Sequence, residues 1–143
     1  MWTVDLEQIK TWLIDLDEKS RTQVVAAIEL LQEHGPQLGR PIVDGVKSSR
    51  HKNMKELRPG SSGKTELRIL FAFDPLQQGI FLIAGDKAGE WKSWYSRNIP
   101  IADDLYDTHL KKIEERRRRE EEVRRGAQRG RRPSSTKNKK KGR

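Results

Sequence analysis

The sequence predicts an α+β fold in which an N-terminal helical hairpin packs on a small antiparallel sheet, followed by a C-terminal helix and a basic, disordered tail. Apolar residues recur at helical spacing before residue 35, three strand-like segments separated by short turns follow at residues 54–86, and the C-terminal end has almost no apolar residues. The chain has 143 residues, of which 33% are hydrophobic, so one core is expected.

The first third of the chain is predicted to form a short strand and a pair of helices. Residues 1–6 alternate apolar and polar side chains, which is the period of a strand. Asp17 is a suitable N-cap for the second helix, and Gly35 with Pro36 is a stop signal at its end. The apolar positions at helical spacing are Ile9, Trp12, Leu13, Leu16, Val24, Ile28 and Leu31. We therefore expect a helical hairpin with one apolar face.

A connection and three strands are predicted next. Residues 37–53 contain glycine, proline and four basic residues, which is typical of a long, exposed connection. Strands are expected at residues 54–58, 66–74 and 79–86, with turn-rich segments between them. Because the turns are short, these strands should pair in an antiparallel meander.

Side-chain alternation places two arginines away from the main core. The apolar residues at positions 67, 69, 71 and 73 share one face of the middle strand, so Arg68 must point to the other face. If Leu57 joins the core, Glu56 and Arg58 point to the side that Arg68 occupies. We therefore expect Arg58 and Arg68 to be neighbours on one open face of the sheet.

Two further helices are expected in the C-terminal third. A short helix from residue 88 carries Trp91, Trp94 and Tyr95, and a second helix begins after Pro100. Spacings of four residues place Lys87, just before this first helix, roughly in line with Trp91 and Tyr95.

The domain organisation follows from the distribution of apolar and charged residues. Residues 1–112 are predicted to be one domain. Residues 113–125 carry opposite charges at a spacing of four, which favours a charged helical extension. Residues 126–143 lack core-forming side chains and are expected to be a basic, disordered tail.

The net charge of +9 resides in the C-terminal part. Residues 1–111 hold 15 Lys and Arg against 16 Asp and Glu, whereas residues 112–143 hold 15 against 5. The tail is either a solvated extension, which is the simpler interpretation, or a tether to ribosomal or other RNA. Any RNA site on the nearly neutral domain must depend on local clusters of residues.

Several common chemistries have little support. The chain has no cysteine, which excludes disulfides and thiolate metal sites, and its three histidines lack a metal-binding spacing. No glycine-rich phosphate loop is present, and we expect neither a metal nor another cofactor. No apolar segment resembles a signal or is long enough to span a membrane, so a cytoplasmic protein without a membrane partner is expected.

A basic and aromatic group remains as a candidate site for RNA chemistry. Cleavage by attack of a 2′-hydroxyl on its phosphate needs a base, an acid and positive charge; arginine forks supply the charge, and lysine or tyrosine can transfer protons. Tryptophan can stack on bases. The catalytic candidates are Arg58, Arg68, Lys87 and Tyr95, and the RNA-binding candidates are Arg50, Lys52, Lys55, Trp91 and Trp94. The structural alternative is that the strand arginines form ion pairs and the aromatic residues belong to the core.

Four motifs occur in order along the chain. They are Met54-Lys55-Glu56-Leu57-Arg58-Pro59, Leu67-Arg68-Ile69-Leu70-Phe71-Ala72-Phe73-Asp74, Ala84-Gly85-Asp86-Lys87 and Trp94-Tyr95. Together they resemble the phage Gp49-like branch of HigB toxins within the RelE/ParE superfamily. The resemblance covers residues 1–112 and leaves out the tail.

This resemblance implies a compact RelE-like toxin of a type II toxin–antitoxin system. It implies a metal-independent endoribonuclease that cleaves mRNA at the ribosome and is neutralised by a helix-turn-helix antitoxin of the HigA kind. The four catalytic candidates stand at the positions of the family's functional residues. Glu56 departs from the pattern, because ribosome-dependent relatives often carry a lysine there. The general base is therefore unassigned, with Lys52 and Lys55 as substitutes and Lys55 expected to face the core.

Two other functions are compatible with the same sequence. The fold also serves ParE-like toxins, which poison DNA gyrase and are not nucleases. A non-catalytic protein that binds nucleic acid mainly through the basic tail is the third interpretation.

Overall fold

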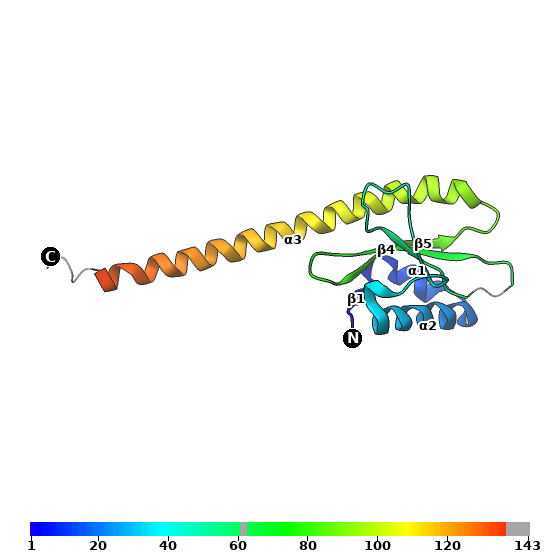
Figure 1. Cartoon of the computed structure of the whole chain (residues 1–143), viewed down its shortest axis with the longest axis horizontal. Helices are drawn as coiled ribbons and strands as arrows, with labels where there is room; N and C mark the ends of the chain where they lie inside the picture. The colour runs from blue at the N-terminus through cyan, green and yellow to red at the C-terminus, as the bar shows by residue number, and fades with distance from the viewer. Residues whose placement is uncertain (61–62, 137–143) are drawn as a thin grey trace. The chain divides into compact units, whose positions relative to one another are not determined.

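A five-stranded mixed sheet lies at the centre of the first of two units in the chain, Met1–Asp107. The structure is a computed structural model (Figure 1) that describes residues 1–60 and 63–136, with backbone only for residues 131–136. The strand order is β1-β5-β4-β3-β2. The strands are β1 (Val4–Asp5), β2 (Val43–Gly45), β3 (Lys55–Leu57), β4 (Leu67–Phe73) and β5 (Gly79–Asp86).

The predicted helical hairpin is confirmed. A 3-10 turn, η1 (Glu7–Ile9), leads into α1 (Lys10–Asp15) and then α2 (Glu18–His34). Asp17 caps α2, because its carboxylate accepts a hydrogen bond from the backbone N–H of Ser20 at 3.2 Å. α2 ends at Gly35, which has φ of 66° and lies so close to the Trp2 ring that a Cβ would approach it to 2.3 Å. A second 3-10 turn, η2 (Gly35–Gln37), follows.

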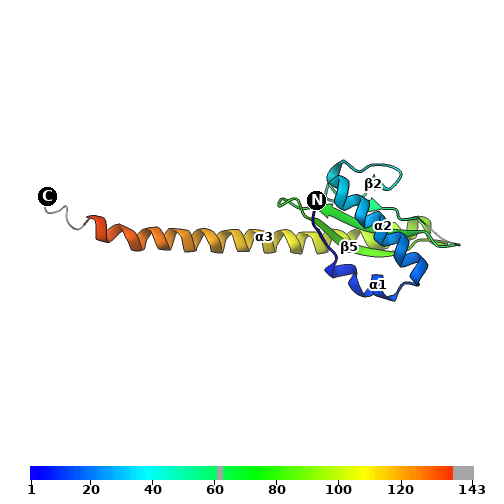
Figure 2. The same ribbon diagram turned by 90° about the horizontal axis from the view of Figure 1, so that it is seen from below.

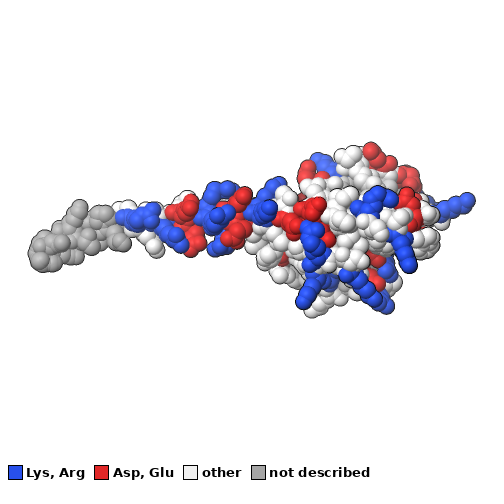
Figure 3. All heavy atoms as spheres, turned by 90° about the horizontal axis from the view of Figure 1, so that it is seen from above, with Lys and Arg blue, Asp and Glu red and all other residues white. Residues whose placement is uncertain are grey.

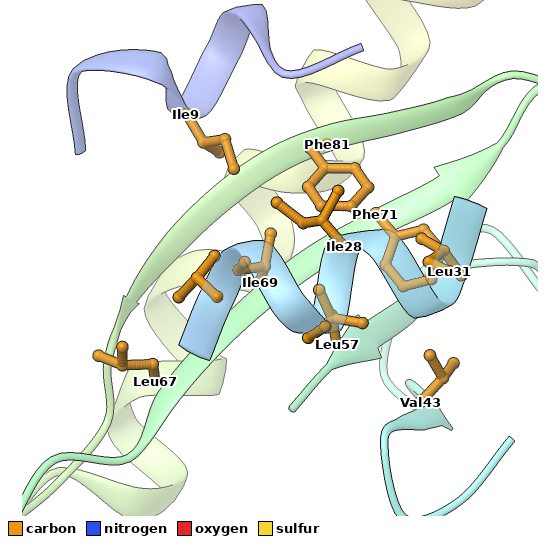
Figure 4. Packing of buried hydrophobic residues seen from close by; sticks show 11 residues of the cluster. Ile9, Ile28, Leu31, Val43, Leu57, Leu67, Ile69, Phe71 and Phe81 are labelled. Carbon is orange, nitrogen blue, oxygen red and sulfur yellow. The ribbon is translucent and has the colours of Figure 1, made fainter. Parts of the chain in front are cut away.

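The main core lies between this hairpin and one face of the sheet (Figure 4), and Figure 2 shows α1 and α2 lying over that face. α2 contributes its buried residues at helical spacing, and β4 contributes the alternate residues that the period of a strand predicts. The buried cluster includes Ile9, Val24, Ile28, Leu31, Leu57, Ile69, Phe71 and Phe81.

Two features of the sheet differ from the prediction. β2 lies inside residues 37–53, where a long exposed connection was expected, because Val43 is buried in the core and pairs with Leu57. β1 pairs with β5 in parallel, so the sheet is mixed. The predicted antiparallel pairing is confirmed from β3 to β5, with a register shift at Leu70 and Phe71, and β2 pairs antiparallel with β3 in addition.

The second face of the sheet is covered, which corrects the expectation of an open face. Up to Asp107, helix α3 (Trp91–Thr136) lies on the side of the sheet opposite α2 (Figure 1). Leu70 and Ala72 are fully buried on this side, and the phenol of Tyr106 donates to the carbonyl of Phe73 at 3.2 Å. The arginines predicted on this face therefore lie between the sheet and a helix.

α3 also corrects the expectation of two separate helices, because it continues through Pro100. Proline inside a helix removes one backbone hydrogen bond and clashes with the preceding turn. Ile99 and Ala102 are buried on either side of it. Packing against the sheet thus outweighs the local preference for a break.

The second unit, Thr108–Arg143, contains the rest of α3. The helix passes Gly126, where disorder was predicted to begin, and reaches Thr136; residues 137–143 of the predicted tail lie outside the described residues. Basic and acidic side chains alternate along this unit (Figure 3), and Arg117 pairs with both Glu114 and Glu121. Among the described residues no helix combines the length and the hydrophobicity that crossing a bilayer requires.

Candidate functional site

Glu56 is the centre of a buried polar cluster between β3, β4 and α3. Its side chain is only 4% exposed. Its Oε2 accepts hydrogen bonds from Nε and Nη2 of Arg58 at 2.9 and 2.7 Å, and its Oε1 accepts one from the phenol of Tyr95 at 2.7 Å. Because Leu57 faces the core, strand alternation turns Glu56 to the opposite side. A carboxylate in this environment needs such partners, since an unpaired buried charge is costly.

Two arginines flank this carboxylate, as the strand alternation predicts. Nε of Arg68 lies 3.9 Å from Oε1 of Glu56, which is an ion-pair distance but too long for a hydrogen bond. That Nε atom is buried and has no hydrogen-bond partner among the described residues, while Nη1 donates to the carbonyl of Leu67 at 2.8 Å. Arg68 Nε is therefore a buried donor without a hydrogen bond, beside the carboxylate of Glu56.

Arg58 is shared between two carboxylates. Besides Glu56, its Nη2 donates to Oδ2 of Asp44 on β2 at 3.1 Å. Partial burial acts to lower the pKa of Arg58, but the hydrogen bond and the charge of Glu56 raise that pKa above its ordinary value. Two arginines and two carboxylates give this cluster no net formal charge.

Tyr95 is held as a protonated phenol. Burial, and then the hydrogen bond and the charge of Glu56, raise the pKa of Tyr95 to about 12, against an opposing effect of Arg68. The Nζ atom of Lys87 lies over the Tyr95 ring, 5.2 Å from its centroid, and 4.6 Å from that of Trp91. The predicted alignment of these three side chains is confirmed. At neutral pH the phenol is therefore suited to donating a proton.

A pocket of about 580 Å³ opens beside this cluster. Its lining includes Glu56, Arg58 and Tyr95, together with Lys47, Lys92 and Ser96. The volume is in the range typical of small-molecule and cofactor sites. Positive charge, a carboxylate and a phenol thus meet at one concave surface.

The loop after β2 is fixed to α3 by a second polar cluster. Asp103 is buried, and it accepts hydrogen bonds from the Ser49 hydroxyl at 2.5 Å and from the backbone N–H of Arg50 at 3.1 Å. His51 approaches Asp107 at 2.7 Å, and Arg50 also pairs with Asp107. These contacts hold the segment that brings Lys47 to the pocket.

The RNA-binding candidates lie in different environments. Trp91 is 59% exposed and Lys52 is exposed, whereas Trp94 is 3% exposed and packs against Gly85, so its ring is a core element and not an exposed stacking surface. Lys55 faces the hairpin side, as predicted, and donates to the carbonyl of Pro36 at 3.3 Å. The predicted basic group is therefore not one continuous surface.

Arg50 is the remaining RNA-binding candidate, and its guanidinium is engaged in ion pairs. It pairs with Asp103, Asp104 and Asp107 and stays 53% exposed. The hydrogen bonds that Arg50 donates to Asp107 and Asp104 raise the pKa of Arg50. In this structure the residue anchors the loop.

Sequence reasoning missed some of the pocket. Sequence analysis identified Glu56 as a departure from the family pattern, but its position at the centre of the cluster was not predicted. Lys92 and Ser96, one helical turn apart on the helix of Tyr95, could have been found from that spacing. Lys47 belongs to the connection that was expected to be exposed. Within residues 1–60 and 63–136, no group of three or more His, Asp or Glu side chains could hold a metal ion.

The fold and the site define a class of protein: a small α+β protein with a helical hairpin on one face of a mixed sheet, and with arginine, glutamate and tyrosine between the other face and the C-terminal helix. The family model described as phage derived protein Gp49-like (DUF891) matches residues 11–107. The chain belongs to this Gp49-like family, in the HigB-type branch of the RelE superfamily.

Two relatives come from Mycobacterium tuberculosis, and both carry a provisional designation as toxins. HigB2 is 56% identical over 114 residues, which cover 80% of this chain and 57% of HigB2. HigB3 is 52% identical over 110 residues, which cover 77% of this chain and 94% of HigB3. The chain thus spans little more than half the length of HigB2. No solved structure matches the chain significantly.

Proposed function

We propose that the protein is the toxin of a type II toxin–antitoxin system and that it cleaves mRNA on the ribosome without a metal ion. Its relatives are named as toxins, and its family is the HigB-type branch. The observation that carries the nuclease proposal is the contact of Glu56 with both Arg58 and Tyr95 at the pocket.

The chemistry is attack of a 2′-hydroxyl oxygen on the adjacent phosphorus. A new bond forms between this oxygen and phosphorus, the bond to the 5′-oxygen breaks, and the products are a 2′,3′-cyclic phosphate and a 5′-hydroxyl. In this scheme Glu56 accepts the proton of the 2′-hydroxyl and Tyr95 donates a proton to the leaving oxygen. The hydrogen bond between the two side chains gives the proton a direct path from Glu56 back to Tyr95.

The arginines supply charge stabilisation. A planar guanidinium matches the geometry of phosphate oxygens, and donors fixed in a partly dry site stabilise charge that develops in the transition state. Arg58 lines the pocket, whereas Arg68 lies outside its lining with a buried, unpartnered Nε that a phosphate would reach only after a small movement of the side chains. In the absence of a ligand both arginines pair with Glu56. A bound phosphate would then share these two guanidinium groups with the carboxylate.

Lys87 acts through Tyr95. Its ammonium lies over the phenol ring and stabilises the negative charge that the ring acquires when Tyr95 gives up its proton. This assigns Lys87 as a positioning and charge-supporting residue, and leaves the proton transfers to Glu56 and Tyr95. A helix-turn-helix antitoxin of the HigA kind is the proposed partner that neutralises the toxin.

The test is brief induction in a bacterial host, followed by mapping of new 5′ ends on cellular mRNA and an assay for chromosomal breaks. Arg68→Ala and Glu56→Gln should abolish the new ends. Arg97→Ala is the matched control, because Arg97 is an exposed arginine of α3 that pairs with Glu90, whereas Arg68 lies at ion-pair distance from Glu56.

Codon-phased ends that persist in the control and vanish in the two site variants support the proposal. Growth arrest with DNA breaks and no new ends would transfer the protein to the gyrase-poison class. If growth arrest and RNA cleavage persist in Arg68→Ala, the assignment of the active site to this cluster is wrong.

A further inference from the structure

Two lysines of the pocket have no role in the proposed proton transfers. Lys47 lies in the loop after β2, and Lys92 is the second residue of α3. Both line the pocket that Glu56, Arg58 and Tyr95 also line. Each lysine is exposed, and neither ammonium has an ion-pair partner among the described residues.

These lysines leave the wall of the pocket with uncompensated positive charge. The third cation of the wall, Arg58, pairs with Glu56 at 2.7 Å and with Asp44 at 3.1 Å. Lys47 and Lys92 add two positive charges that no carboxylate within residues 1–60 and 63–130 pairs with. A concave surface with such an excess attracts anions.

The backbone is held on both sides of Lys47. Before it, the N–H of Val46 donates to the carbonyl of Met54 at 3.2 Å. After it, the Ser49 hydroxyl donates to the buried carboxylate of Asp103 at 2.5 Å. A ligand at Lys47 therefore has to order a side chain and not a whole loop, which lowers the entropic cost of binding.

Lys92 lies on the same face of α3 as Tyr95 and Ser96. It precedes Tyr95 by three residues, which is about 4.5 Å along the helix axis. Successive phosphates of one strand are at least about 3.4 Å apart. The long side chain of Lys92 can therefore reach the phosphate next to one bound at Arg58 and Tyr95, and the hydroxyl of Ser96 offers a further donor at the same wall.

The rest of the pocket suits a nucleotide better than a simple polyanion. Val46, Ile99 and Pro100 give the lining an apolar part. Such a surface can cover a sugar and a base, which a bare polyphosphate lacks. A volume of about 580 Å³ is of the size that takes small molecules, so it can receive part of one strand and not a double helix.

We propose that Lys47 and Lys92 form a second phosphate subsite, which binds the phosphate that adjoins the scissile one in a single strand of RNA. The choice of RNA rests on the proposed function, in which the scissile phosphate lies at Arg58 and Tyr95. Phosphate contacts fix the register of a nucleic acid without reading its sequence. The two lysines therefore position the strand at Glu56 and take no part in the proton transfers.

The experiment compares two 2′-O-methyl trinucleotides of one sequence. One has two phosphate linkages, and in the other the second linkage is an uncharged methylphosphonate. Neither can be cleaved by 2′-hydroxyl attack. NMR titration of the full chain gives the two dissociation constants for wild type, for a test variant with Lys47→Gln and Lys92→Gln, and for a matched control with Lys10→Gln and Lys19→Gln. The control removes the same charge from exposed lysines of the helical hairpin, on the other side of the sheet. Circular dichroism checks that both variants keep their helix content.

Wild type and control are expected to bind the doubly charged trinucleotide at least about fivefold more tightly than the methylphosphonate form, and the test variant about twofold or less. The inference is overturned if the test variant keeps the wild-type preference or if the control loses it equally. It is also overturned if wild type binds neither trinucleotide, or if tripolyphosphate at equal concentration displaces the trinucleotide from wild type.

Mapping of mRNA ends reports on cleavage separately. New ends that vanish in Glu56→Gln, without any effect of the lysines on trinucleotide binding, would refute the subsite alone. Dependence of binding on the two lysines, without new mRNA ends, would refute the nuclease proposal alone.

Discussion

Tyr95 on α3 donates a 2.7 Å hydrogen bond to Oε1 of Glu56 on β3. This contact joins the C-terminal helix to the strand that leads into Arg58, and it places a proton donor against a carboxylate at the wall of the pocket. Because Glu56 also binds Arg58 through its other oxygen, a change at any of the three residues alters the environment of the other two. Their coupling can be measured by titration and by mutation.

Stability is expected to fall as the pH rises from about 10 to about 12. The phenol of Tyr95 ionises at its ordinary pKa in the unfolded chain, whereas its pKa in the folded protein is raised to about 12. In this window only the unfolded state releases the proton, so unfolding becomes more favourable; at lower pH the contribution is fully present. After allowance for solvent screening, the loss attributable to Tyr95 is about 1 to 2 kcal/mol.

Urea unfolding of wild type and Tyr95→Phe across that pH range measures this effect. The variant should show the shallower decline in the free energy of unfolding. Tyr106→Phe is measured beside it, because burial also raises the pKa of Tyr106 and the contributions of the two tyrosines must be separated. Parallel curves for wild type and Tyr95→Phe would contradict the assignment.

Removal of Arg58 is expected to destabilise the fold, because the buried carboxylate of Glu56 loses its main ion-pair partner. Glu56 is 4% exposed, and Arg58→Ala takes away two of its hydrogen bonds. The expected cost is about 2 to 4 kcal/mol. Glu56→Gln in the same background should restore part of it, because an amide carries no charge. A double-mutant cycle of Arg58→Ala and Glu56→Gln, measured by urea unfolding, gives the coupling energy between the two residues. We expect a coupling energy above about 1 kcal/mol, and additive effects of the two substitutions would contradict the ion pair's role.

The loop that carries Lys47 should loosen when Asp103 is changed. Asp103→Ala removes the acceptor of the Ser49 hydroxyl and of the Arg50 backbone N–H, at an expected cost of about 1 to 3 kcal/mol. Asp104→Ala, at a side chain that is 77% exposed, should cost less than about 1 kcal/mol. Amide hydrogen exchange at Lys47 should accelerate in the first variant only. Equal exchange rates in both variants would show that Asp103 does not hold the loop.

The close approach of Trp94 to β5 predicts that Gly85 tolerates no side chain. A Cβ at this position would lie 2.8 Å from Nε1 of the buried indole. Gly85→Ala is therefore expected to lower the free energy of unfolding by about 1 to 3 kcal/mol. Gly39→Ala is the control, since a Cβ there meets no atom within 4 Å. A wild-type unfolding midpoint for Gly85→Ala would mean that Trp94 can move away from the strand.

Much of the fold could be predicted because strand and helix periods are local properties of the sequence. Alternation along β4 was enough to place Arg68 opposite the core and beside the strand of Arg58. The parallel pairing of β1 with β5 could not be predicted, since Val4 meets Gly79 only through tertiary packing. The same holds for the helix through Pro100, where buried neighbours override a local rule.

The sequence indicated most of the residues of the candidate site, but it did not indicate how they are arranged. Spacing placed Lys87 in line with Tyr95, and the structure confirms this. The burial of Trp94 and the position of Glu56 depend on α3 covering the second face of the sheet, which strand alternation alone does not indicate. Long-range packing therefore decides which of the polar residues meet.

The most direct test of the central claim is the chemistry of the cleaved ends. Purified protein is incubated with ribosomes and a short mRNA, and the fragments are identified by mass spectrometry, with Tyr95→Phe and an mRNA that carries a 2′-deoxynucleotide at the scissile position as controls. We expect one fragment to end in a 2′,3′-cyclic phosphate and the other to begin with a 5′-hydroxyl. Neither fragment should form with Tyr95→Phe or with the 2′-deoxy mRNA. Fragments with 3′-hydroxyl and 5′-phosphate ends, or cleavage that persists at the 2′-deoxy position, would contradict this mechanism.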